Sequence, residues 1–357
     1  MSDRRAVARL RDVAEAAGVS VTSVSRYLNG SLNLPDETAS RIDTAIKTLG
    51  YRPNPHARSL SLGRSNTIGL VIPDIANPFF AQLAASVEAA ADDRGLGVLL
   101  CATLNRAGRE HEYLERLRRN HVDALLFITN HPDDGSLAEA IGGEPRIALL
   151  DEDIVGTKVP KVFSDNFGGG YAATAHLVEA GHRRIAFLGG PREMMSTRDR
   201  MAGCRKALSE AGSDADLVAA TYGDYSIAQG RAAAENLLGK LSGATAVIAA
   251  SDGMAVGLME VLVERSLTVP GDLSIVTFDD VEPVHLFNPP LTAIHQPVAE
   301  MGRRGVEIVA RQARGETPPS DVEHLACTLI ARASVATPAN KPGRTRLNQR
   351  RNQHASH

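Results

Sequence analysis

The chain has 357 residues, of which 43% are hydrophobic and 23% charged, with a formal net charge of −3. The length predicts about two to three structural units, and the composition is that of an ordinary globular protein. The small negative charge argues against a protein that coats nucleic acid over its whole surface.

The first 64 residues are the basic part of the chain. They hold ten Lys and Arg against six Asp and Glu, a balance of about +4, which leaves about −7 for the remainder. This asymmetry is typical of a small nucleic-acid-binding module attached to an acidic body.

Three helices are predicted in this basic part. They span 10–17, 21–28 and the segment between Pro35 and Gly50. Leu10, Val13, Ala14 and Ala17 follow the spacing of a one-faced helix, and Gly18 suits the left-handed position that ends it. Ser20 is a favourable N-cap for the second helix.

Two helices joined by a Gly-containing turn predict a helix-turn-helix, whose second helix lies in the major groove of DNA. The helical spacing turns Val24, Tyr27 and Leu28 inward and leaves the opposite face for DNA. We expect base contacts from Val21, Thr22 and Arg26, and phosphate contacts from Ser20, Ser25 and Asn29. On the helix pattern alone, a three-helix protein-interaction domain remains the alternative.

Residues 51–65 interrupt the helices with two prolines and a glycine, and predict a linker that becomes helical when it packs on a partner. From Thr67, apolar runs alternate with helical stretches, which predicts parallel sheets covered on both faces. The apolar runs are 67–73, 97–102, 124–128, 146–150, 184–189, 246–250 and 273–278. So many units predict two doubly wound lobes, with the break near 160–166. Ligands bind such sheets at the carboxyl ends of the strands.

Several features limit the class of protein. The three cysteines are far apart in sequence, which predicts reduced thiols and no disulfide framework or metal cluster. No 18-residue apolar run exists, and the charged N-terminus lacks a signal core, so we expect a cytoplasmic protein with no membrane role. Residues 336–357 carry five Lys and Arg and no acid, and predict a disordered, solvated tail.

Sequence motifs point to one family. The segment LRDVAEAAGVSVTSVSRYLNG resembles the opening signature of the LacI/GalR family of bacterial repressors, and YRPNPHARSLSLGRS resembles its hinge. IGLVIPDIANPFFAQL, SDNFGGGYAATAHLVEAGHRRIAFLGGP, ASDGMAVG, LSIVTFDD and PPLTAIHQP continue the resemblance in the family's order, over about residues 9 to 335.

This resemblance implies a fold and a division of the chain. An all-α helix-turn-helix headpiece with a hinge helix joins a two-lobed α/β sensor domain like a periplasmic binding protein, with two doubly wound parallel sheets. The expected division is 1–53 for the DNA-binding domain, 54–64 for the hinge, 65–335 for effector binding and dimerisation, and 336–357 for the tail. Lobe 1 is expected at about 65–163 plus 295–325, and lobe 2 at about 164–294.

The resemblance also implies roles for single residues. Val21, Thr22 and Arg26 match base-reading positions, and Leu60 of the hinge would enter the minor groove as an apolar wedge, with Asn54 and Ala57 as further DNA contacts. The expected effector-binding residues are Asn77, Phe79, Asp151, Ser196, Arg200, Tyr225, Ser251, Asp252, Asp279 and Gln296.

Each effector-binding residue has a plainer interpretation. Asp252 would cap the following helix, Asp151 would be a surface turn residue, and Arg200 would belong to a solvated face. Phe79 and Phe80 would both be core, although we expect one of them to line the cleft. Ser251 stands where sugar-binding relatives have an amide, and methionines occupy 194–195, so the identity of the effector stays open.

The sequence therefore predicts a dimeric, ligand-responsive transcription regulator, most consistent with a repressor, that binds a near-palindromic operator in double-stranded DNA. A sugar or sugar derivative is the expected effector, and no cofactor or metal is expected. The alternative is a two-lobed solute-binding protein without a DNA role, which the N-terminal helices oppose. We expect no enzyme, because the common phosphate-binding and hydrolase motifs are absent from the sequence. The operator, the sign of the effector and the choice between dimer and tetramer are not predicted.

Overall fold

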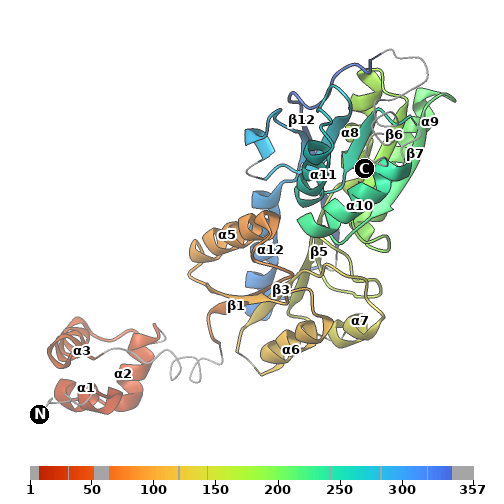
Figure 1. The fold of residues 1–357 in the computed structure, drawn as a ribbon. Coiled ribbons are helices and arrows are strands. Elements are labelled where there is room, and N and C mark those ends of the chain that lie inside the picture. The colour runs from red at the N-terminus through yellow and green to blue at the C-terminus, as the bar shows by residue number, and fades with distance from the viewer. Residues whose placement is uncertain are drawn as a thin grey trace, which may run out of the picture. The chain divides into compact units, whose positions relative to one another are not determined.

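The computed structural model describes residues 8–30, 32–51, 64–119, 121–142, 144–240, 243–281, 284–319 and 321–339. The chain divides into two compact units, Met1–Asn66 and Thr67–His357. Figure 1 shows helices alone in the first unit and two sheets flanked by helices in the second.

The described residues of the first unit form a headpiece of three helices. Its helices are α1 (Leu10–Ala17), α2 (Val21–Leu28) and α3 (Asp36–Leu49). Gly18 follows α1 with a φ of 67°, a left-handed conformation that glycine adopts without strain. The Ser20 Oγ accepts a hydrogen bond of 3.0 Å from the Ser23 amide and so caps α2. A small core unites the helices, formed by Val13, Ala14, Ala17, Val24, Ile42 and Ala45.

The second unit contains two six-stranded sheets. The first has the order β11-β5-β4-β3-β1-β2 and consists of β1 (Thr67–Ile72), β2 (Gly97–Ala102), β3 (Ala124–Phe127), β4 (Ile147–Leu150), β5 (Lys161–Ser164) and β11 (Val322–Leu325). The second has the order β12-β10-β9-β8-β6-β7 and consists of β6 (Arg184–Gly189), β7 (Asp216–Tyr222), β8 (Ala246–Ala249), β9 (Ser274–Asp279), β10 (Thr292–His295) and β12 (Thr328–Ile330).

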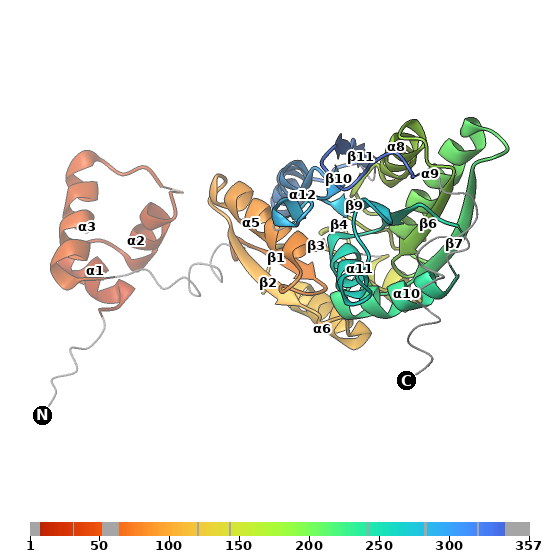
Figure 2. The same cartoon turned by 45° about the horizontal axis from the view of Figure 1, so that its top comes forward.

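Helices cover both faces of each sheet. The first sheet packs on α5 (Pro78–Asp92) and α12 (Val298–Ala313) on one face, and on α6 (Ala107–Arg118) and α7 (Ser136–Ile141) on the other. The second sheet packs on α10 (Ile227–Lys240) and α11 (Asp252–Glu264), and on α8 (Asn166–Glu179) and α9 (Met195–Ala211) (Figure 2). A short 3-10 turn, η1 (Val284–Leu286), adds to the second lobe's core.

The expected fold class is confirmed, with one difference in the sheets. All described strand pairs are parallel except β12, which pairs antiparallel to β10. The chain passes between the lobes three times, between β5 and α8, between β10 and α12, and between β11 and β12. These crossings place residues of both lobes next to one cleft. The domain boundaries given above stay predictions.

No helix within the described residues is both long enough and apolar enough to cross a membrane. The three cysteines are unpaired, and Cys101 and Cys204 are buried.

Candidate functional site: a DNA-reading helix and a cleft between two lobes

The solvent-facing side of α2 carries the residues expected to read bases. Val21, Thr22 and Arg26 are exposed, whereas Val24 is fully buried against the other two helices. A Val and a Thr methyl group can contact a thymine methyl, and an Arg can contact a guanine edge through two hydrogen bonds. Helix α2 therefore presents a short, mixed apolar and cationic face of the kind that fits a major groove.

Three further DNA contacts were expected around α2. Ser20 is exposed, and Ser25 and Asn29 are half-buried. The hydroxyl of Ser20 already caps α2, which places it at the end of the helix where a phosphate can approach. Asn54, Ala57 and Leu60 lie outside the described residues.

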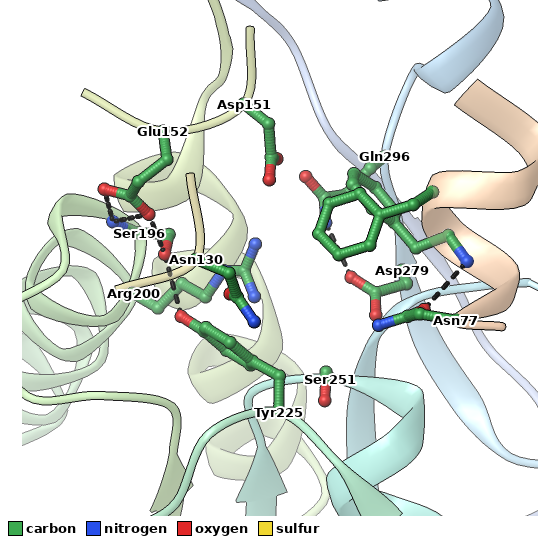
Figure 3. A pocket seen from close by; sticks show the side chains of 12 residues that line it. Asn77, Asn130, Asp151, Glu152, Ser196, Arg200, Tyr225, Ser251, Asp279 and Gln296 are labelled. Carbon is green, nitrogen blue, oxygen red and sulfur yellow. Dashed lines mark hydrogen bonds between the residues drawn. The ribbon is translucent and has the colours of Figure 1, made fainter. Parts of the chain in front are cut away.

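In the second unit, a cavity lies between the two lobes, at the carboxyl ends of the strands (Figure 3). It has about 370 Å³ of empty space, part of which is open to solvent. Its lining consists of Asn77, Phe79, Phe80, Asn130, Asp151 and Glu152 from the first lobe, and of Ser196, Arg200, Tyr225, Ser251, Asp279 and Gln296 from the second lobe and the crossing after β10.

Two adjacent carboxylates follow β4 and serve different partners. Asp151 has a φ of 67°, in the left-handed region, and its carboxylate points into the cavity in Figure 3. Desolvation raises the pKa of Asp151 to about 7, with the Glu152 carboxylate adding to the effect and Arg200 opposing it. Near neutral pH, this carboxyl group is therefore only partly ionised.

The carboxylate of Glu152 reaches across the cleft to the N-terminus of α9. It accepts hydrogen bonds from the Ser196 hydroxyl at 2.6 Å and from the Ser196 amide at 3.2 and 3.3 Å. The Tyr225 hydroxyl joins this network, 2.8 Å from the Ser196 Oγ and 2.7 Å from the Thr197 Oγ1. Burial raises the pKa of Glu152, and the hydrogen bonds from Ser196 partly offset the increase. Glu152 thus ties the first lobe to a helix of the second.

Arg200 is the cationic residue of the cavity lining, and contacts with other residues of the second lobe hold its side chain. Its Nε donates to the Asn166 Oδ1 at 2.7 Å, its Nη1 donates to the Ala250 carbonyl, and the guanidinium lies 4.4 Å from the centroid of the Phe278 ring. These contacts fix the side chain in one orientation. Figure 3 shows the guanidinium directed into the same space as Asp151.

Asp279 and Gln296 form the opposite wall. The Gln296 Nε2 donates to the Asp279 Oδ1 at 2.6 Å, and the Asp252 amide donates to the Asp279 Oδ2 at 3.3 Å. The Gln296 Oε1 is buried and accepts no hydrogen bond from the described residues. An acceptor left in this state is costly unless a donor from a bound molecule completes it.

Three lining residues have backbone conformations that L-amino acids rarely adopt. Asp151, Tyr225 and Asp279 have φ values of 67°, 69° and 96°. Such conformations cost about 1–3 kcal/mol each and concentrate at binding sites, because the surrounding fold must hold them. Their occurrence on three strand ends that meet at one cavity supports a binding role.

The structure brings nine of the ten predicted effector residues to this cavity and leaves Asp252 aside. The Asp252 carboxylate instead accepts from the Thr277 hydroxyl at 2.9 Å and the Val281 amide at 2.8 Å. Nor is it the cap of its helix: α11 begins at Asp252 itself, and Ser251 caps it by accepting from the Met254 amide. Asp252 therefore supports Asp279 from behind the lining of the cavity.

Sequence reasoning missed Asn130 and Glu152 and left Phe80 undecided between core and cleft. Both Phe79 and Phe80 line the cavity while being 4% exposed. Asn130 follows β3 and donates from its Nδ2 to the Asp224 carbonyl of the other lobe at 3.4 Å. The position of Asn130 and Glu152 just beyond apolar strands was the signal that could have found them. No group of His, Cys, Asp and Glu suited to a metal ion occurs among the residues that the structure describes.

Comparison with known proteins gives two family matches along the chain. Residues 9–54 match the model for bacterial regulatory proteins of the lacI family, and residues 174–335 match the model for a periplasmic binding protein-like domain. The HTH-type transcriptional regulator DegA of Bacillus subtilis (strain 168) is 34% identical over 328 residues, which are 91% of this chain and 97% of DegA.

Solved structures show the same fold over nearly the whole chain. A complex of the transcriptional regulator CelR with cellobiose has a TM-score of 0.70 and 33% identity, and the match covers 92% of this chain and all of that one. The lac repressor dimer bound to operator and the anti-inducer ONPF has a TM-score of 0.80 and 27% identity, covering 93% of this chain and all of that one.

Proposed function

The chain belongs to the lacI family of bacterial regulatory proteins and is a DNA-binding transcription regulator, and we propose that a polyhydroxylated small molecule held in its cleft controls its affinity for an operator. The proposal rests on one observation above the others. The cavity draws its lining from both lobes, so a molecule that fills it contacts both at once.

Contact with both lobes provides the means of control. A ligand shifts an equilibrium only by binding one arrangement more tightly than another, and a molecule between lobes has different contacts when the lobes rotate. We propose that two chains pair and place two α2 helices on the halves of a near-palindromic operator. Effector binding would change the lobe angle, and with it the distance between the two hinge segments at 54–64. Repression is the proposed outcome of DNA binding.

A sugar or sugar derivative suits the cavity. Carboxylate, amide and guanidinium groups can bond hydroxyls, and Phe79 and Phe80 offer apolar surface to the C–H face of a ring. The CelR structure, which holds cellobiose, supports the same class of effector. Catalysis is not part of the proposal. A solute-binding protein without a DNA role does not explain the match of residues 9–54 to a DNA-binding family.

Two measurements on the purified full chain test this function. An operator selected from random duplex DNA is labelled, and binding is followed by fluorescence anisotropy at several salt concentrations. A panel of sugars, sugar acids, sugar phosphates and nucleobases is then screened for a saturable rise in melting temperature. We expect at least one compound to raise the melting temperature and to change operator affinity at the same concentration. A compound that binds without changing operator affinity would refute the proposed coupling.

A substitution in the hinge segment tests the proposed minor-groove wedge. We expect Leu60→Ala to weaken binding to the selected operator more than binding to unrelated DNA, because a wedge acts only where the DNA bends to receive it. Equal losses on both DNAs would remove the wedge from the proposal and leave the rest standing.

A further inference from the structure

The charges around the cavity are unbalanced. Of the twelve residues that line it, Asp151, Glu152 and Asp279 carry carboxylates, and Arg200 is the single one with a cationic side chain. A cavity with this lining repels an added anion at short range, since desolvation strengthens every charge interaction inside it.

The positive charge of Arg200 already acts on the protein's own carboxyl groups. Its guanidinium stabilises the ionised forms of all three carboxylates, and lowers the pKa that burial would otherwise give each of them. Two of its nitrogens are already bonded, to Asn166 and to the carbonyl of Ala250. A phosphate or carboxylate would have to compete with the protein's own carboxyl groups, to the extent that they are ionised, for this one cation.

Helix N-termini do not supply a substitute. Helices α5, α9 and α11 begin at the cavity, and such ends attract anions through their free amides. Here the protein itself occupies amides in the first turn of each. The Asn77 Oδ1 accepts from the Phe79 amide at 3.0 Å and the Ser251 Oγ from the Met254 amide at 3.1 Å, while Glu152 takes the Ser196 amide. An incoming anion would meet side-chain oxygens at these three sites.

Two acceptor groups of the cavity, the Asp151 carboxyl group and the Gln296 Oε1, lack a hydrogen-bond donor in the described part of the chain. The Asp151 carboxylate points into the cavity and accepts no hydrogen bond from the residues that the structure describes. The Gln296 Oε1 is buried and also without a donor among the described residues. Hydroxyl and ammonium groups donate to such atoms, whereas a phosphate dianion or a carboxylate only accepts.

We propose that the effector carries no anionic group and is a neutral or amine-bearing polyol whose donors complete Asp151 and Gln296. This inference rests on the proposed function and narrows it. It excludes sugar phosphates, sugar acids and nucleotides as effectors, and retains neutral sugars and amino sugars.

The experiment compares matched compounds on the unmodified full chain. Glucose, galactose, ribose and cellobiose are the neutral probes, and glucosamine and galactosamine the amines. Gluconate, galacturonate, glucose 6-phosphate and ribose 5-phosphate are the anions. Melting temperature and operator affinity are both followed. We expect binding among the neutral or amine probes, and each anion to bind at least about tenfold more weakly than its parent sugar.

The outcomes separate this inference from the proposed function. An anion that binds more tightly than its neutral parent and changes operator affinity overturns the inference and leaves the proposed function intact. If no probe of any charge binds, the inference falls together with the sensing half of the proposed function.

A charge-removing variant tests the cause. Asp151→Asn keeps the shape of the side chain, and we expect it to weaken the best neutral or amine probe by about tenfold and to narrow the gap to its anionic analogue. The control is Glu112→Gln on α6, which makes the same change of charge at an exposed side chain away from the cavity and should leave both affinities unchanged. An unchanged gap in Asp151→Asn would show that the charge of the cavity does not select the ligand.

Discussion

Replacing Glu152 by alanine should speed up hydrogen exchange at the first turn of α9 in the ligand-free protein. The first amides of a helix have no partner within the helix and depend on acceptors from elsewhere. For Ser196 that acceptor is a carboxylate on the opposite lobe. The amide of Ser196 therefore reports on whether the two lobes are held together at this point.

The geometry sets the size of the effect. The bond from the Ser196 hydroxyl at 2.6 Å is a short, charge-assisted bond, whereas the amide shares its hydrogen between two oxygens at 3.2 and 3.3 Å. Hydrogen bonds to charged groups contribute about 1.5–3 kcal/mol. The raised pKa of Glu152 shows that burial offsets part of this gain. We expect a loss of about 1.5–3 kcal/mol, which corresponds to about 10- to 150-fold faster exchange of the Ser196 amide.

Hydrogen–deuterium exchange followed by mass spectrometry on peptides covering 190–200 measures this rate. Glu152→Gln is the matched variant, because its side chain keeps one acceptor oxygen and loses a charge that burial already disfavours. The exchange rate of the Ser196 amide in Glu152→Gln should lie between the rates in the parent protein and in Glu152→Ala. The internal control is the N-terminus of α11, where Ser251 caps from within its own lobe. Unchanged exchange at Ser196 in Glu152→Ala, or equal acceleration at both helices, would refute the cross-lobe role of Glu152.

Two substitutions in the cleft and one in the headpiece test other contacts of the structure. The pKa of Asp151, about 7 against 3.8 as its ordinary value, means that the folded protein keeps a proton that the unfolded chain has lost between these values. The stability that this proton contributes to the folded protein is fully present below about pH 4 and is lost as the pH rises to about 7. The loss amounts to at most about 4 kcal/mol. The free energy of unfolding, measured by urea denaturation at pH 5 and at pH 8, should therefore differ less between the two pH values in Asp151→Asn than in the parent protein. Tyr225→Phe removes the hydroxyl that forms hydrogen bonds with Ser196 and Thr197, and it should lower the free energy of unfolding by about 1–2 kcal/mol. Urea denaturation measures this loss, and an unchanged midpoint would refute the prediction. Val24→Ala leaves a gap in the small headpiece core and should lower the stability of the headpiece by about 2 kcal/mol. We expect this variant to lose operator binding and to keep the rise in melting temperature that the effector causes. Loss of both would contradict the independence of the two units.

The headpiece was predictable because its signals are local. Gly18 ends α1 and Ser20 caps α2 in the structure as the sequence predicts, and each depends on residues within one turn. The second unit was predictable where strands are buried on both sides. The apolar runs omit β7, β11 and β12, whose residues are mostly half-buried or exposed. They also omit β5 and β10, in each of which only two apolar residues lie between polar ends. Such strands lack the continuous apolar run that marks a central strand.

The site was predictable by position and less so by orientation. A polar residue after an apolar strand lies at the edge where ligands bind, which is why most candidates meet at the cavity. Which way each side chain turns depends on tertiary contacts. Asp252 turns inward because the Thr277 hydroxyl and the Val281 amide offer it donors. The neighbouring Ser251 takes the capping role that was the alternative interpretation of Asp252.

Asp151 and Glu152 show how one backbone conformation divides two like charges. The left-handed φ of Asp151 turns the chain sharply, so that one carboxylate enters the cavity while the next reaches α9. The charge of Glu152 raises the pKa of Asp151, and Arg200 lowers the pKa of both groups. A donor-rich molecule that stabilises the charge of Asp151 must therefore also change the ionisation of Glu152, and with it the bonds that Glu152 accepts across the cleft. We therefore expect the charge of the ligand to influence the hydrogen bonds that Glu152 accepts from Ser196 across the cleft.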